Sequence, residues 1–90
     1  MQGIDPESEK KILNRLKRAQ GQLTAVINAV EGDTVCRDVV TQLAAVSRAL
    51  DRAGFAMIAT AMRACAEDPE EAQAADLTTE ELEKLFLALS

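Results

Sequence analysis

The sequence predicts an all-α protein, and three observations support this fold class. Apolar residues recur at spacings of three and four over most of the chain, which is the period of a helix packed along one face. Although 48% of the residues are apolar, only Phe55 and Phe86 are aromatic, whereas a β-sheet protein normally carries more aromatic and β-branched residues. Helix-start and helix-stop residues divide the 90 residues into two long helices and one short helix. This length suits a single domain, residues 1–90.

The first long helix is expected to begin at Asp5-Pro6, with Asp5 as the N-cap and Pro6 at the first helical position. A basic stripe formed by Lys11, Arg15 and Arg18 lies about 80° to one side of the packing seam. Gly21 within this helix indicates close approach of another backbone. The apolar seam itself follows spacings of four and three: Ile12, Leu16, Ala19, Leu23, Val26 and Val30.

The second helical pattern runs from Thr34 to Ala66, after Gly32 ends the first helix and with Asp33 or Thr34 as the next N-cap. Cys36 lies in its first turn and Cys65 in its last. The two cysteines are 29 residues apart, so on an unbroken helix they share one stripe and are separated by about 44 Å.

These two cysteines cannot meet within one chain. If the helix folded back at Gly54, which could otherwise mark a kink or a close crossing, one cysteine would overshoot the other by about 10 Å. Two copies packed antiparallel bring Cys36 of one chain level with Cys65 of the other. The spacing therefore predicts an antiparallel dimer with two equivalent two-thiol sites.

The third helix is short and follows an acidic connector, residues 67–76. Thr78 is its expected N-cap, with Glu81 completing a capping box before the amphipathic residues Leu82, Leu85, Phe86 and Leu89. Two long helices and one short helix leave much apolar surface uncovered in a chain of this size. Self-association into a helical bundle is therefore expected.

The net charge of −5 is unevenly distributed. Residues 1–63 hold nine Lys and Arg against seven Asp and Glu, whereas residues 64–90 hold one lysine against eight acids. Residues 10–18 carry five bases and no acid, and Arg48 and Arg52 lie one turn apart on the second helix. This basic surface is either a solvated face or a nucleic-acid interface.

Several function classes lack the residues that they need. The chain has no histidine, which excludes most imidazole-based catalysis and removes the commonest nitrogen ligand for metals. No apolar run approaches the roughly 18 residues of a membrane span, and residues 1–11 do not resemble a signal peptide. We therefore expect a cytoplasmic protein with reduced cysteines, no cofactor, no resident metal and no enzymatic activity.

The chain resembles the CsoR/RcnR family of repressors over residues 10–66. The resemblance rests on Arg15 to Leu23, on Val30-Glu31 and on Cys36 to Leu43. It implies an all-α protein without a helix-turn-helix, whose antiparallel dimers pair as a dimer of dimers and repress transcription until an inducer binds. It also implies DNA contacts from Arg15, Lys17 or Arg18 and Arg52. With the neighbouring bases, the candidate operator-binding residues are Lys10, Lys11, Arg15, Lys17, Arg18, Arg48 and Arg52.

The resemblance also bears on the inducer. Copper(I)-sensing members combine a cysteine at the position of Cys36 with a His-x-x-x-Cys pair on the other chain, but here Ala61 precedes Cys65 by four residues. Nickel and cobalt sensors need several imidazoles, and formaldehyde sensors have a proline at position two, where this chain has Gln2. The remaining pattern resembles the CsoR-like sulfurtransferase repressor (CstR) branch, which keeps both cysteines and responds to reactive sulfur species.

The sequence thus predicts a repressor that senses persulfides and polysulfides through Cys36 and Cys65 of the facing chain. Cys36 lies in the first helical turn beside Arg37, a setting that favours the attacking thiolate. Di-, tri- or tetrasulfide crosslinks would weaken operator binding and derepress sulfide-detoxification genes. The expected partners are operator DNA, further copies of the chain and low-molecular-weight persulfides.

Other readings of the same residues remain open. Two thiolates can bind Cu(I) without an imidazole, which makes a copper-sensing repressor the main alternative. Both cysteines could instead be small core residues, since free cysteine is often buried. The chain could also be an acidic helical adaptor, for which no salt-sensitive DNA binding is expected. A sulfur-exchange enzyme would need a general base, and no base can be named.

Overall fold

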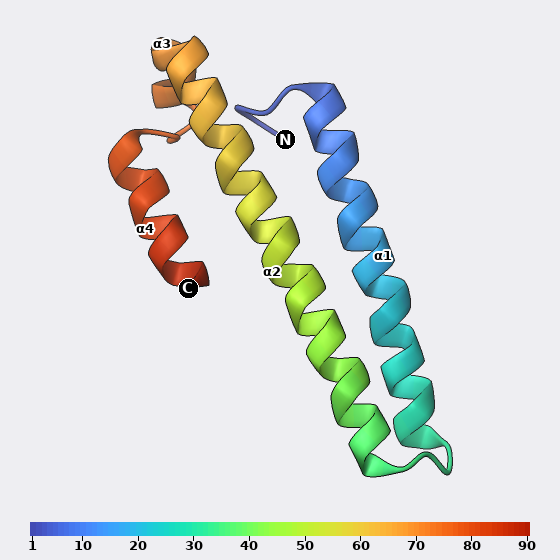
Figure 1. The fold of residues 1–90 in the computed structure, drawn as a ribbon. Helices are drawn as coiled ribbons and strands as arrows, with labels where there is room; N and C mark the ends of the chain where they lie inside the picture. The colour runs from blue at the N-terminus through green and yellow to red at the C-terminus, as the bar shows by residue number, and fades with distance from the viewer.

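The computed structural model describes residues 1–90 and contains only helices, which confirms the all-α class. They are α1 (Pro6–Glu31), α2 (Cys36–Glu67), α3 (Pro69–Ala74) and α4 (Thr79–Leu89). Helices α1 and α2 form a long antiparallel hairpin, and α4 folds back along the C-terminal half of α2 on the side away from α1 (Figure 1). The molecule measures 54 × 25 × 14 Å, with a radius of gyration of 16.4 Å, whereas a compact domain of this length would have about 12 Å. It is therefore an elongated, nearly single layer of helices.

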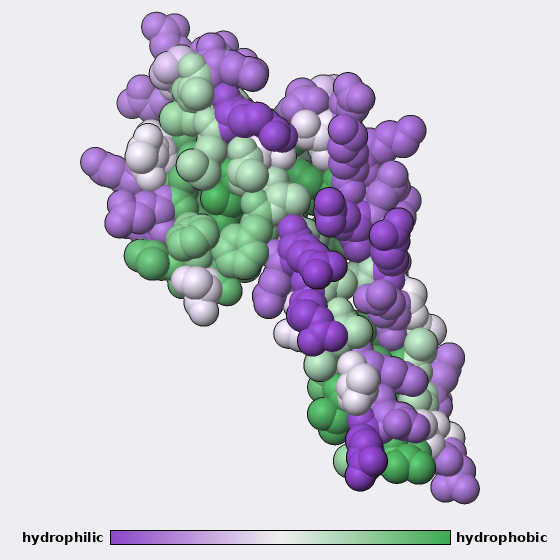
Figure 2. Space-filling view, in the orientation of Figure 1, coloured by the Kyte–Doolittle hydropathy of each residue, from purple (hydrophilic) through white to green (hydrophobic).

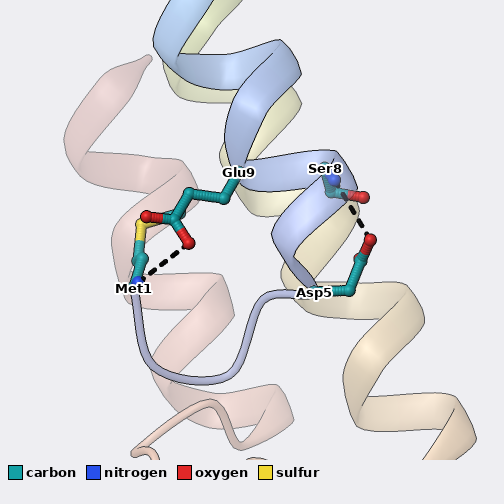
Figure 3. A network of polar contacts seen from close by, with 4 residues as sticks. All are labelled: Met1, Asp5, Ser8 and Glu9. Atoms are coloured by element: carbon teal, nitrogen blue, oxygen red, sulfur yellow. Dashed lines mark hydrogen bonds and ion pairs between the residues drawn. The ribbon is translucent and has the colours of Figure 1, made fainter.

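The start of α1 is fixed by the expected cap. The Asp5 side chain accepts a hydrogen bond of 3.0 Å from the backbone N–H of Ser8, and the amino group of Met1 pairs with Glu9 at 3.1 Å (Figure 3). The bond from Ser8 lowers the pKa of Asp5, because it favours the ionised carboxylate. This stabilisation is present while Asp5 is ionised and is lost as the pH falls through that lowered pKa. The predicted N-cap is confirmed.

Helix α2 begins later than predicted but is continuous. Its N-cap is Val35, which makes no side-chain capping bond, so neither Asp33 nor Thr34 caps it, and Cys36 is its first residue. The backbone N–H of Gly32 donates to the carbonyl of Asn28, which confirms Gly32 as the C-cap of α1. Gly54 introduces no break. A Cβ there would lie 2.8 Å from Leu89 Cδ1, so this glycine marks the close approach of α4.

The prediction of three helices was incomplete, because the acidic connector contains a fourth, six-residue helix. Asp68 accepts a hydrogen bond of 3.1 Å from the N–H of Glu71, and Pro69 follows at the first helical position. This start signal repeats the one at Asp5-Pro6, and the buried Ala72 anchors the turn. The cap of α4 is as predicted, since Thr78 accepts from the N–H of Glu81 at 3.3 Å.

The core within one chain is thin. On α1 every second residue of the predicted seam is buried, namely Ile12, Ala19 and Val26, which are seven positions apart, while Leu23 and Val30 stay exposed. Leu82 of α4 is buried, and the Phe55 and Phe86 rings pack with centroids 5.5 Å apart. No atom outside its own helix lies within 4 Å of a Cβ built at Gly21, so no part of this chain makes the close approach expected there. Only 10 of 90 residues are buried, which leaves apolar side chains on the surface (Figure 2).

No helix combines the length and the apolar character that a membrane crossing requires.

Candidate nucleic-acid interface and thiol pair

The antiparallel hairpin aligns the basic stripe of α1 with the arginines of α2. One groove between the two helices is lined by Arg15 and Arg18 from α1 and by Arg48 and Arg52 from α2. Ala45 and Ala49 also line it. This first groove therefore holds four of the seven predicted DNA-binding residues.

A second groove continues the first towards the start of α1. It shares Arg15 and Arg18 and adds Lys11 and Arg63. No acidic residue lines either groove, and the two ion pairs of the chain, Met1 with Glu9 and Lys84 with Glu81, involve none of these bases. We call the combined surface the basic groove and define it by Lys11, Arg15, Arg18, Arg48, Arg52 and Arg63. Its six unpaired positive charges run along the line where α1 and α2 meet, and hydrophilic residues follow that line in Figure 2.

Arg63 belongs to the basic groove but is not among the predicted DNA-binding residues. One of its guanidinium nitrogens, Nη2, donates to the hydroxyl of Thr60 at 3.3 Å, and this buried hydroxyl donates to the carbonyl of Ala56 at 2.8 Å. Helical spacing could have identified it. Arg52 and Arg63 are 11 residues apart, about three helical turns, and therefore share a face of α2.

Two of the predicted bases lie elsewhere. Lys10 and Lys17 are exposed on α1 but line neither groove, because they project roughly 110° away from the basic stripe. Their contact with DNA stays a prediction.

The basic groove has a defined end. Beyond Arg63, the cleft between the start of α1 and the end of α2 is lined by acids, namely Asp5, Glu67, Asp68 and Glu71. A polyanion lying in the basic groove would meet these carboxylates and be repelled there. The charge pattern therefore limits the extent of the surface to the middle of the hairpin.

The two cysteines occupy opposite ends of α2 and different surroundings. Both are free thiols; Cys36 is exposed, whereas Cys65 is half-buried. An apolar groove beneath α4 holds Cys65 beside Ile58, Met62, Leu82 and Phe86, and we call it the Cys65 groove. Since α2 is continuous, about eight turns separate the thiols. The structure therefore does not bring them together within one chain.

A metal site of the usual kind is not complete in one chain. No three residues among His, Cys, Asp and Glu are placed to share an ion. Ala61, four residues before Cys65, is 4% exposed and offers no donor atom. The donors at the C-terminal end of α2 fit a soft ion such as Cu(I), since Cys65 supplies a thiolate and Met62 a thioether.

Comparison with known proteins places the chain in a family. Residues 8–89 match the family described as metal-sensitive transcriptional repressor. The copper-sensing transcriptional repressor CsoR of Mycobacterium ulcerans is 39% identical over 59 residues, which cover 66% of this chain and 50% of that protein. The repressor of the same name from Mycobacterium bovis is 35% identical over 57 residues, covering 63% and 48%. The chain thus spans about half the length of these relatives, and no solved structure matches it significantly.

These findings define a class of transcriptional repressors and not of enzymes. The chain belongs to the metal-sensitive transcriptional repressor family, CsoR/RcnR, as its sequence motifs suggested.

Proposed function

We propose that this chain represses transcription by holding operator DNA in the basic groove and releases it when reactive sulfur species link Cys36 to Cys65 of the partner subunit. One observation carries the proposal. The two thiols lie on one stripe at opposite ends of an unbroken helix, and no imidazole accompanies them. This arrangement suits a bond between subunits, as in the CstR branch that the sequence resembles.

The basic groove supports the DNA-binding half of the proposal. The phosphate backbone attracts unpaired guanidinium groups, and the released counterions make such binding strongly dependent on salt. Three of the six bases, Arg48, Arg52 and Arg63, come from α2, the helix that also carries both cysteines. A shift of α2 relative to α1 would therefore separate the bases of the two helices and weaken the interface.

The exposed apolar residues of α2 support the antiparallel dimer. Val40, Leu43 and Leu50 lie near the cysteine stripe and are each about half exposed or more. An antiparallel pairing that places Cys36 at the same height as Cys65 of the partner subunit would also place Leu43 at the height of Ile58 of the partner subunit. The first turn of the partner's α2 would then lie at the level of the Cys65 groove, where Cys65 is half-buried beside α4. Pairing of two such dimers into a tetramer follows from the family resemblance and from the remaining apolar surface.

The proposed chemistry transfers sulfane sulfur. The Cys36 thiolate attacks the outer sulfur of a persulfide RSSH, which gives Cys36–SSH and releases the thiolate RS⁻. Attack by Cys65 of the partner subunit on Cys36 Sγ then forms a disulfide and releases H₂S. If both cysteines carry SSH, their condensation gives a trisulfide and H₂S. If one carries SSSH and the other SSH, their condensation gives a tetrasulfide and H₂S. The added atoms lengthen the bridge beyond the Cβ separation of about 3.5–4.5 Å that a disulfide requires.

Mass spectrometry without reductant tests the proposal. Reduced protein is exposed separately to an organic persulfide, to hydrogen peroxide and to Cu(I), and intact and peptide masses are measured. We expect dimer-mass species that join the Cys36 and Cys65 peptides, with added sulfur atoms only after persulfide. Cys36→Ala should stay on its operator after persulfide, and release by this variant would refute the mechanism.

Copper(I) is the second candidate inducer, because the two relatives described above are named copper-sensing repressors and the family is described as metal-sensitive. Cys36 and Cys65 of the partner subunit could hold Cu(I) between two thiolates. Thiols that stay unmodified after persulfide, with Cu(I) retained and DNA released, would favour this candidate over sulfur sensing.

A further inference from the structure

The Cys65 groove contains a second sulfur atom that the proposed sulfur chemistry does not use. Met62 and Cys65 line this groove together, and they are three residues apart on α2. Side chains at this spacing lie on one helix face with Cβ atoms about 5–6 Å apart. Met62 is 57% exposed despite its apolar character.

The chemistry of the groove restricts what these sulfurs could bind. Its other walls are mostly apolar, with Ile58, Leu82 and Phe86 around the two sulfurs. The remaining donors are the oxygens of Thr79 and Glu83, and hard oxygen ligands suit Mg²⁺ or Ca²⁺ rather than a soft ion. Thiolate and thioether together select Cu(I).

We propose that Met62 and Cys65 form one chain's half of a three-sulfur Cu(I) site, which Cys36 of the partner subunit completes. This inference rests on the second candidate function and on the antiparallel dimer. A thioether is neutral, as imidazole is, so Met62 supplies the third donor that Ala61 lacks without changing the charge of a site with two thiolates. The position of the third donor moves by one residue along α2, from the buried face at Ala61 to the open groove.

Copper(I) affinity tests the site directly. The reduced protein is titrated anaerobically against a chromogenic Cu(I) chelator, as wild type, Met62→Leu and Met57→Leu. Leucine keeps the apolar volume and removes the sulfur. Met57 is the matched control, because it also lies on α2 but does not line the Cys65 groove. Since loss of outer-shell partners alone costs about 10–100-fold, we expect Met62→Leu to weaken Cu(I) binding by at least about tenfold. Met57→Leu should bind as the wild type does.

X-ray absorption of the copper-loaded protein gives a second readout. Protein labelled with selenomethionine should show a copper–selenium contact in wild type and in Met57→Leu, but not in Met62→Leu. The last variant should contain two-coordinate copper held by the two thiolates. Equal affinities for wild type and Met62→Leu, or a wild-type site without selenium, would overturn the proposal and leave Met62 as a packing residue.

Copper sensing and the Met62 site can be refuted independently of each other. DNA release by Cu(I) tests the second candidate function, whereas coordination and affinity test the site. Met62→Leu should still form the persulfide-dependent crosslink, because both cysteines remain. A wild-type protein that does not bind Cu(I) would refute the site and leave the sulfur-sensing proposal in place.

Discussion

Arg63 shows how one side chain is placed by its own helix. Its guanidinium group is held by the hydroxyl of Thr60, and it stands where the basic groove meets the acidic cleft. If Arg63 contacts a phosphate, Arg63→Ala should weaken binding to a promoter duplex and reduce the salt dependence of log K by about one for each subunit in contact. Fluorescence anisotropy over a range of salt concentrations measures both effects.

Arg37→Ala is the matched control for this variant. It removes the same charge from an exposed site at the N-terminal end of α2, outside the basic groove. Equal losses for the two variants would mean that net charge, and not the groove, determines affinity. Thr60 keeps its bond to the Ala56 carbonyl in Arg63→Ala, so the helix should be unaffected.

At the scale of residues, the sequence predicts which charged side chains share a face of one helix, but not which residues of another helix lie beside them. The stripe of Lys11, Arg15 and Arg18 follows from helical spacing alone. Its alignment with Arg48, Arg52 and Arg63 depends on how α1 and α2 pair, which is a long-range property of the hairpin. The absence of an imidazole is evident from the sequence. The groove that Met62 and Cys65 share could not be predicted, because it depends on the position of α4.

Among the helices, α4 has few anchors and covers one of the two thiols. Leu82 is 5% exposed and lines the Cys65 groove. Because truncation of a buried leucine costs about 2 kcal/mol or more, Leu82→Ala should loosen α4 from α2. Cys65 should then react faster with iodoacetamide. Peptide mass spectrometry measures this rate, with exposed Cys36 as the internal reference.

Leu87→Ala provides the control, since Leu87 lies on the same helix and is 62% exposed. In Leu87→Ala, Cys65 should react with iodoacetamide at the same rate as in the wild type. If Leu82→Ala leaves the Cys65 rate unchanged relative to Cys36, then α4 does not limit access to this thiol.

The helices also show which local signals suffice for prediction. Asp5, Gly32 and Thr78 were identified because each helix end has its own capping chemistry. The start of α2 was placed two residues too early, because Asp33 and Thr34 are good N-caps by type but Val35 occupies the position. Helix α3 was missed because six residues are too few to show a helical period, although Asp68-Pro69 repeated the start signal of α1.

A single copy of the chain leaves one side of the α1–α2 hairpin uncovered. Its radius of gyration of 16.4 Å and its 10 buried residues describe a hairpin with one covered side. Leu43 and Leu50 lie on the uncovered side and are 50% and 47% exposed. In a pair that levels Cys36 with Cys65, Leu50 lies beside the twofold axis, so each copy of this side chain would be buried near the other.

Leu50→Glu should therefore separate the copies. Two carboxylates beside the axis would lose hydration and repel each other, at a cost of several kcal/mol for an unpaired buried charge. Analytical ultracentrifugation should show a smaller species than wild type, and persulfide should no longer link Cys36 to Cys65. Thr24→Glu, an exposed change on the outer side of α1, should alter neither property. A Leu50→Glu protein that keeps its mass and still forms the crosslink would exclude antiparallel pairing through this face, and with it the shared site on which both candidate inducers depend.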